Sequence, residues 1–78
     1  MLHTLKIHRN YYEELVAGNK TFELRWNDRN FQKGDILEFY DTETLVVHKQ
    51  KFEILSVFSS LPCLGLKEGW VILSLKLI

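Results

Sequence analysis

The stretch Gly18-Asn19-Lys20-Thr21-Phe22-Glu23-Leu24-Arg25-Trp26 decides the fold, because two periodicities meet in it. Upstream, apolar side chains at positions 11, 12, 15 and 16 follow the spacing of an amphipathic helix. Gly18 stands where a left-handed residue closes a helix. From position 22 the period is two, with apolar side chains at 22, 24 and 26 and polar ones between them. The stretch therefore predicts a helix that leads into a strand whose apolar face, Trp26 included, lies in the core.

The predicted helix covers residues 10–18. Asn10 is a favourable N-cap residue, and Glu13 stands three positions later, which is the spacing of a capping box. A helix of about two turns is stable only when it packs on another element, so we expect it to lie against a sheet.

Five segments have the pattern of strands: residues 2–7, 20–26, 36–40, 45–58 and 70–78. Turn-forming residues separate several of them, at 27–30, 33–35 and 41–44, and residues 59–69 read as a loop. Polarity rises at 49–51 inside the longest segment, which predicts a bulge there. One helix and five or six strands indicate an α+β domain. In so short a chain, a partly or fully closed β-barrel is the simplest way to limit exposed sheet edges.

Composition restricts the class of protein. The 78 residues, 46% of them hydrophobic, suit one domain over residues 1–78. No apolar run is long enough for a membrane span, and no signal-peptide core follows Met1, so we expect a cytoplasmic protein without membrane contact. Ten basic and ten acidic residues exclude a chain that coats nucleic acid by bulk charge. Residues 1–33 nevertheless hold six basic groups and four acidic ones, a local excess that suits the orientation of an anionic ligand and, equally, ordinary surface scatter.

Metal, cofactor and nucleophile signatures are missing from the sequence. His3 and His8 are an odd number of residues apart, so on a strand they face opposite sides. The one cysteine, Cys63, gives no metal-binding pair and no internal disulfide, and we expect it to be a small buried apolar residue. No phosphate-binding glycine loop or serine nucleophile motif occurs. We therefore expect no metal and no cofactor.

The charged residues of the opening stretch are the main candidate site. Glu23 and Arg25 are two apart and share one face of the predicted strand, and Lys20 stands at its start. The three converge where the helix ends, so Glu23 is placed between two cations that would orient a polar or anionic ligand. The competing interpretation is a row of surface ion pairs with no ligand.

The pattern Gly18-x-Lys20-x-x-Glu23-x-Arg25 resembles the GxKxxExR motif of ASCH domains, which are PUA-like β-barrels. The resemblance extends to a small stand-alone bacterial and phage branch and covers nearly the whole chain. The similar segments are Leu5-Lys6-Ile7, Tyr11-Tyr12, Lys20-Thr21-Phe22-Glu23-Leu24-Arg25, Asn27-Asp28-Arg29 with Phe31, Gly34-Asp35, and Gly65-Leu66-Lys67-Glu68-Gly69-Trp70-Val71-Ile72-Leu73-Ser74. The resemblance implies a barrel of five or six strands with the helix packed near a cleft.

For the function, the resemblance implies a module that binds RNA, or a nucleotide or nucleoside, in that cleft. The ligand-binding residues it implies are Lys20, Glu23, Arg25, Asn27, Asp28 and Arg29. Lys and Arg side chains contact phosphates or base edges, and Glu23 accepts from an exocyclic amine or holds the cations in place. Base stacking is open to four aromatic residues, each of which also suits the core: Tyr11, Tyr12, Trp26 and Trp70.

Two alternatives remain. One ASCH branch resembles small amidohydrolases that act on N4-acylated cytidine, and in this chain that reading would use Lys20, Thr21 and Glu23, with Glu68 as a distant carboxylate. Glu23 occupies the position at which that branch has a threonine, which departs from its pattern. The other alternative is a barrel with a structural or protein-interaction role. The sequence does not indicate an oligomeric state. The leading expectation is a binding module that is not an enzyme.

Overall fold

The computed structural model, which describes residues 1–59 and 65–78, contains one helix and five strands. In chain order they are β1 (Leu2–Ile7), α1 (Arg9–Ala17), β2 (Phe22–Trp26), β3 (Ile36–Asp41), β4 (Val47–Phe58) and β5 (Trp70–Leu77). The strands form one sheet in the order β1-β3-β4-β5-β2. β1 and β3 pair in parallel and the other neighbours pair antiparallel. The predicted α+β class, with five strands and an early helix, is confirmed.

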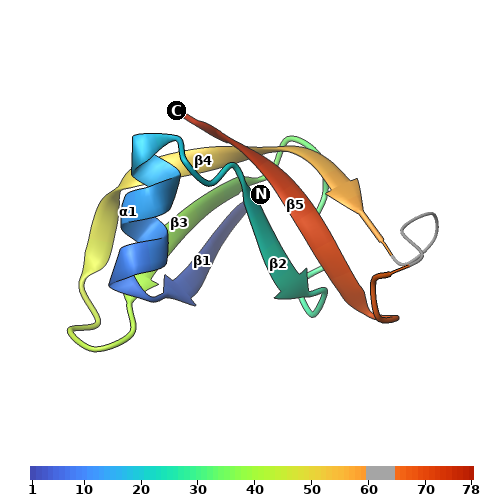
Figure 1. Ribbon diagram of the computed structural model, residues 1–78, viewed down its shortest axis with the longest axis horizontal. Helices are drawn as coiled ribbons and strands as arrows, with labels where there is room; N and C mark the ends of the chain where they lie inside the picture. The colour runs from blue at the N-terminus through green and yellow to red at the C-terminus, as the bar shows by residue number, and fades with distance from the viewer. Residues whose placement is uncertain (60–64) are drawn as a thin grey trace.

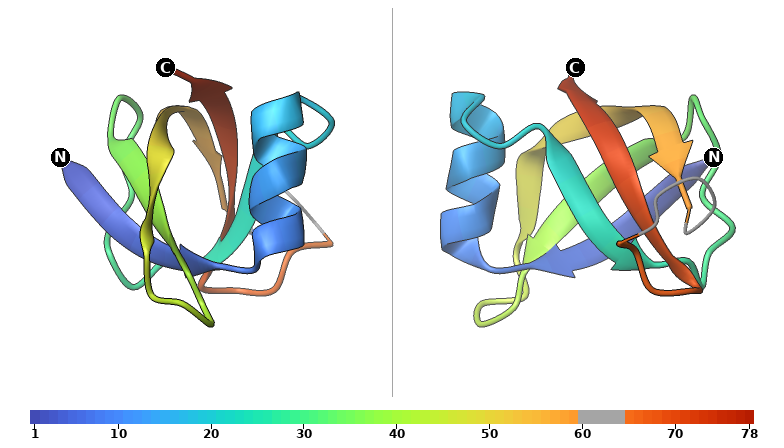
Figure 2. Two further views of the ribbon diagram at one scale, coloured as in Figure 1. Left: turned by 90° about the vertical axis from the view of Figure 1, so that its left-hand side faces the viewer. Right: turned by 45° about the vertical axis from the view of Figure 1, so that its right-hand side comes forward.

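The sheet curls into a half-barrel, so that its two outermost strands, β1 and β2, come to face each other (Figure 1). Among the described strands they do not pair: β1 has β3 as its neighbour and β2 has β5. The two views of Figure 2 show the curl with α1 standing beside the first half of β4. The barrel is therefore open along one side, between β1 and β2.

A bulge in β4 gives α1 its docking place. Glu38 pairs with Lys51, but Tyr40, two residues on, pairs with Val47, so β4 carries two extra residues there. This confirms the irregularity predicted near 49–51. The bulge leaves the Gln50 backbone N–H free to donate to the Tyr12 hydroxyl at 3.3 Å. The Tyr12 ring also stacks on His48, with centroids 3.7 Å apart, so the helix is fixed to β4.

The ends of α1 agree only in part with the sequence. Gly18 closes the helix with a φ of 80°, and its N–H bonds back to the last turn, as predicted. The predicted capping box at Asn10 and Glu13 is wrong. The N-cap is His8, which makes no side-chain capping bond, because β1 ends at Ile7 and the chain turns into the helix at once.

The hairpin between β3 and β4 falls where the turn residues 41–44 placed it. One carboxylate oxygen of Asp41 accepts from the backbone N–H groups of Glu43 (2.8 Å) and Thr44 (3.1 Å). These two bonds, more than the nearby Arg9, hold the pKa of the Asp41 carboxyl below its usual value. Asp41 therefore fixes the turn as well as the end of β3.

The core lies on the concave face of the sheet and under α1. Its buried apolar members are Leu5, Ile7, Leu15, Phe31, Leu37, Phe39, Phe52, Ile54, Val71, Leu73 and Leu75. Tyr12, Val16 and Val57 pack against them. Four of the five strands thus bury apolar side chains at alternate positions.

β2 is the exception, and its predicted orientation is wrong. Glu23 is buried, at 5% exposure, whereas Phe22, Leu24 and Trp26 are each about half exposed. The assignment of Trp26 to the core is therefore incorrect. The reason is position: the inner face of β2 borders the open side of the barrel, where charged groups find partners across the gap.

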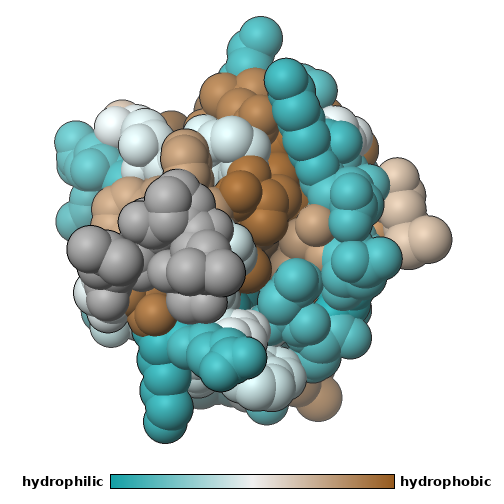
Figure 3. Space-filling model, turned by 90° about the vertical axis from the view of Figure 1, so that its right-hand side faces the viewer, coloured by the Kyte–Doolittle hydropathy of each residue, from teal (hydrophilic) through white to brown (hydrophobic). Residues whose placement is uncertain are grey.

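Apolar side chains also reach the surface elsewhere. Figure 3 looks at the end of the molecule remote from α1 and shows hydrophobic surface gathered at the centre of that face, with hydrophilic side chains along much of its margin. In the described part of the chain, no helix is long and apolar enough to cross a bilayer. The expectation for Cys63 lies outside the described residues.

Candidate functional site

The open side of the barrel is a cleft of about 810 Å³. One wall is the end of β1 with His8, and the other is β2 with the turn that follows it. Its charged lining consists of four cations and two carboxylates: Lys6, Lys20, Arg25, Arg29, Glu23 and Asp28. The cleft exists because β1 and β2 each leave one edge unpaired.

Glu23 is the centre of the charged lining. One carboxylate oxygen accepts from the Lys20 ammonium at 2.6 Å and the other from the Arg25 Nε–H at 2.9 Å. The Glu23 side chain is 6% exposed, while those of Lys20 and Arg25 keep about a fifth of their surface. The Lys20 ammonium also lies 4.9 Å from the centre of the Tyr11 ring. A buried carboxylate thus holds two cations in fixed positions, and both cations have more N–H donors than these bonds use.

Two arginines span the cleft to the free edge of β1. Arg25 donates from Nη2 to the Lys6 carbonyl at 2.7 Å, and Arg29 donates from Nη1 to the Thr4 carbonyl at 3.0 Å. These carbonyls point away from β3, since Met1 and Ile7 supply the carbonyls that accept from the β3 side. Side chains therefore take the place of the strand–strand hydrogen bonds that would close the barrel.

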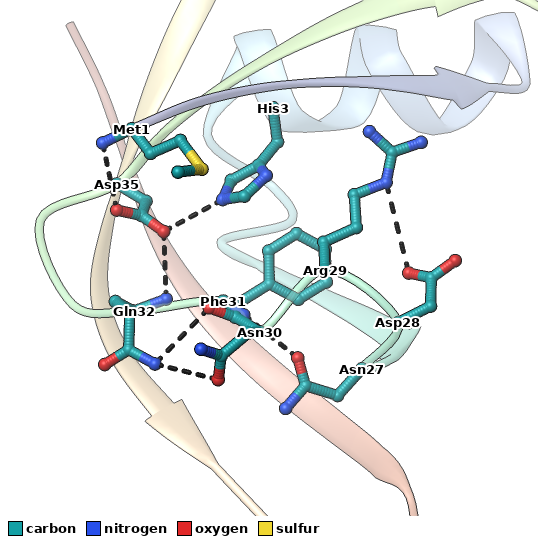
Figure 4. Close-up of polar contacts among 9 residues, drawn as sticks. All are labelled: Met1, His3, Asn27, Asp28, Arg29, Asn30, Phe31, Gln32 and Asp35. Atoms are coloured by element: carbon teal, nitrogen blue, oxygen red, sulfur yellow. Dashed lines mark hydrogen bonds and ion pairs between the residues drawn. The ribbon is translucent and has the colours of Figure 1, made fainter.

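The turn at 27–29, drawn in Figure 4, brings two of its three residues to the cleft. Asp28 and Arg29 line the cleft and lie 4.0 Å apart, both well exposed. Asn27 does not line it: its side-chain oxygen accepts from the Phe31 backbone N–H at 3.0 Å. Its own N–H donates to the Gly69 carbonyl at 2.9 Å. Asn27 is therefore a turn-forming residue rather than a cleft residue.

A second polar cluster lies at the start of β1 and β3 (Figure 4). The buried Asp35 carboxylate accepts from the Gln32 N–H at 3.0 Å, pairs with the Met1 amine at 3.1 Å, and lies 2.9 Å from His3 Nε2. The His3 bond is the largest of the causes that lower the pKa of Asp35 to about 2, and burial opposes them. The sequence contained one indication of this cluster: His3 shares the inward face of β1 with Leu5 and Ile7.

The structure brings together five of the six residues expected to bind ligand, namely Lys20, Glu23, Arg25, Asp28 and Arg29. Thr21 and Glu68 do not line the cleft; Thr21 borders a separate cavity of about 150 Å³ behind the end of α1. Among the aromatic candidates, Tyr11, Trp26 and Trp70 line the cleft, the first two about half exposed, whereas Tyr12 packs on β4.

Sequence reasoning missed part of the lining. Lys6, His8, Tyr40 and Thr42 also border the cleft. The Thr42 hydroxyl and His8 Nδ1 are 3.4 Å apart. Nothing in the sequence linked them, because they meet only through the parallel pairing of β1 with β3. Among the described residues, no group of three or more His, Cys, Asp or Glu side chains is arranged to hold a metal ion.

Comparison with known proteins gives a family and a fold. The sequence profile of a family described as "Domain of unknown function (DUF3850)" matches residues 2–75. A protein of Escherichia phage P2, described as "Uncharacterized 12.9 kDa protein in GpA 3'region", is 35% identical over 40 residues. Those residues are 51% of this chain and 37% of the phage protein, so the match spans well under two thirds of that relative's length. The crystal structure of hypothetical protein PH0355 superposes with a TM-score of 0.70 and 21% identity over 100% of both chains. At that identity the likeness shows a shared fold.

Proposed function

The chain belongs to the DUF3850 family, and we propose that it binds RNA, or a nucleotide or nucleoside, in the cleft between β1 and β2. One observation carries the proposal. The cleft concentrates four of the ten basic groups but only two of the ten acidic ones. It therefore has a formal charge of +2 in a chain whose formal charge is zero. An excess confined to one concave surface attracts an anion without making the whole protein adhere to nucleic acid.

The size and lining of the cleft suit this class of ligand. A volume of about 810 Å³ falls in the range of small-molecule sites, roughly 300–1,000 Å³. Lys20 and Arg25 are held by Glu23 and present their remaining N–H groups to a phosphate or a base edge. Tyr11, half exposed and beside Lys20, offers a ring on which a base can stack.

The resemblance of the Gly18 to Arg25 motif to that of ASCH domains supports the same assignment. The motif residues Lys20, Glu23 and Arg25 all lie on the cleft. An ASCH-type module that reads unpaired bases would use them as hydrogen-bonding groups and the Arg29 turn as a rim.

The proposal is tested by titrating the protein with short single-stranded RNAs, nucleoside monophosphates and nucleosides. We expect Lys20→Ala to weaken binding by about tenfold or more, since a hydrogen bond to a charged group contributes about 1.5–3 kcal/mol. Lys33→Ala removes the same charge from an exposed turn outside the cleft and serves as the matched control. If Lys20→Ala and Arg25→Lys bind every ligand as the parent does, the proposed site is wrong.

Salt dependence separates the ligand sources. A mononucleotide that contacts one or two cations gives a shallow fall of affinity with salt, whereas an RNA that contacts more phosphates gives a steeper one. Arg29→Ala is expected to reduce the slope for RNA, because Arg29 stands at the rim where a longer strand would leave the cleft.

The amidohydrolase alternative gains no support from the position of Thr21, which borders the other cavity. A nucleophilic hydroxyl has to lie within about 3 Å of its base and beside the substrate. Release of acetate from N4-acetylcytidine that is abolished by Lys20→Ala would restore this alternative.

A further inference from the structure

In the structure of residues 1–59 and 65–78, the outer face of β2 and its neighbours is an apolar surface that stays partly or half exposed. The pairing register aligns its side chains in rows across three strands. Leu24 pairs with Ile72, which pairs with Phe58, and beside this row Trp26 pairs with Trp70. The third row places Phe22 next to Ser74 and Ser56. We call these eight residues the β2–β5–β4 face.

The side chains of this face are exposed to an unusual degree for their type. Phe22, Leu24, Trp26 and Phe58 are between 43% and 52% exposed, and Trp70 and Ile72 are partly exposed. A wholly buried aromatic side chain accounts for roughly 150–250 Å². The face therefore presents on the order of 400–500 Å² of apolar surface, within the roughly 300–600 Å² of the largest apolar patch on a single soluble chain, which often has a function.

We propose that this face is the interface of a homodimer, with the β2–β5–β4 face of a second copy as its occupant. The first argument is area. A stable interface takes about 800 Å² from each partner, of which about 56–65% is apolar. The apolar area of this face matches that share, and the polar residues around it supply the rim.

The second argument is charge. None of the eight residues is ionisable, so a two-fold interface sets no charge against its own copy. The first charged outward positions lie outside the rows, where Glu53 pairs with Lys76 across β4 and β5. The chain as a whole carries ten basic and ten acidic groups, so two copies approach each other without net repulsion at neutral pH. At the border of this face, the Lys20 ammonium lies 5.6 Å from the centre of the Phe22 ring. Four of the eight residues also line the cleft: Phe22, Leu24, Trp26 and Trp70.

The third argument is the conformation of Trp26. A Cβ on Gly69 would overlap the Trp26 ring. The ring is thus pressed on the Gly69 backbone and in edge contact with Trp70, at a centroid distance of 6.0 Å. This packing places a large side chain, half exposed, between Gly69 and Trp70. Fixed, uncharged aromatic groups are typical of the centre of interfaces.

The experiment is sedimentation equilibrium of the full chain between about 1 and 200 μM, a range suited to an interface of standard size and modest affinity. We expect the apparent mass to rise from 9.3 kDa towards twice that value. Leu24→Glu and Phe58→Glu place a charge against its own copy and are expected to weaken dimerisation by more than tenfold. Val46→Glu, at a position 62% exposed on the β3–β4 hairpin, is the matched control and is expected to dimerise as the parent does.

A second readout uses the two tryptophans, which both lie on this face. Their emission is expected to shift to shorter wavelength as the parent protein is concentrated, and to stay unshifted in Phe58→Glu. This measurement needs no substitution in the parent, so it tests the proposal even if a variant fails to fold. A parent that stays at 9.3 kDa throughout, or a dimer whose tryptophan emission does not change, overturns it.

Discussion

β3 and β2 are strands of similar length, but β3 turns its apolar side chains to the interior and β2 turns its charged ones. β3 buries Leu37 and Phe39 completely. β2 buries Glu23 and leaves Phe22 and Leu24 half exposed. β3 is flanked by β1 and β4, whereas β2 has a sheet neighbour on one side and the cleft on the other.

The difference shows how sheet position decides which face of an alternating strand is buried. A central strand is covered on its inner face by the whole core, so a charge there has no partner. On an edge strand that faces a gap, the inner side chains lie opposite unpaired backbone groups of the other edge strand and can hydrogen-bond to them. Arg25 does so by donating to the Lys6 carbonyl, and Glu23 fixes Arg25.

The largest expected effect comes from the apolar interior of β3. Phe39→Ala removes a side chain with no exposed surface that packs edge-on against Phe52. We expect the free energy of unfolding in urea to fall by about 3–5 kcal/mol, from lost burial and the cavity left behind. Tyr40→Ala, at the neighbouring, partly exposed position that borders the cleft, is the comparison and should cost less. Equal losses would mean that the inner face of β3 is not the core.

Glu23→Gln tests the charged interior of β2. The substitution keeps the shape but leaves Lys20 and Arg25 partly buried without a counter-charge. Removing one partner of a wholly buried pair costs about 3–5 kcal/mol, and the partial exposure of both cations reduces this to about 2–3 kcal/mol. Glu13→Gln on the exposed side of α1 is the control, and urea unfolding of both variants measures the effect. A loss below about 0.5 kcal/mol would make the Glu23 cluster an ordinary surface pair.

Asp35→Asn tests a buried carboxylate that lies just before β3 and does not line the cleft. Its pKa is lowered from 3.8 to about 2, so its contribution is present above pH 4 and is lost as the pH falls towards 2. We expect the variant to be less stable by about 1–2 kcal/mol at pH 6. The difference should shrink as both proteins are acidified to pH 2.

The control is Asp28→Asn, whose side chain is 61% exposed. At pH 6 its unfolding free energy should be close to that of the parent, because Asp28 makes none of the bonds of the Asp35 cluster. A constant difference between parent and Asp35→Asn across this range would contradict the assigned pKa.

Most of the fold was predictable because it depends on short-range patterns. Gly18 marked the end of α1, the polar residues 49–51 marked the bulge in β4, and Asp41 to Thr44 marked the hairpin. The motif spacing also brought Lys20, Glu23 and Arg25 together correctly. These features are local, so the residues that cause them are neighbours in the sequence.

The errors have a common cause in long-range structure. Alternation along β2 revealed two faces, but it did not say which one is turned inward; that depends on β1, which lies across the cleft. The start of α1 was misplaced because the end of β1, and not the capping potential of Asn10, determines where the chain turns. The contact of His8 with Thr42 and the Asp35 cluster arise from the pairing of β1 with β3, about 34 residues apart in sequence.

The smallest expected effect is on the outer face of β2. Leu24→Thr keeps a residue suited to strands and changes a side chain that is 51% exposed. At protein concentrations too low for dimerisation, we expect the unfolding free energy to change by no more than about 0.5 kcal/mol. Leu37→Thr makes the same change on the inner face of β3 and should cost several times as much, because it buries a hydroxyl and leaves a void. If the two substitutions lower the unfolding free energy of the monomer equally, then β2 does not present its apolar face to solvent. In that case both the orientation of β2 in the structure and the proposed interface are wrong.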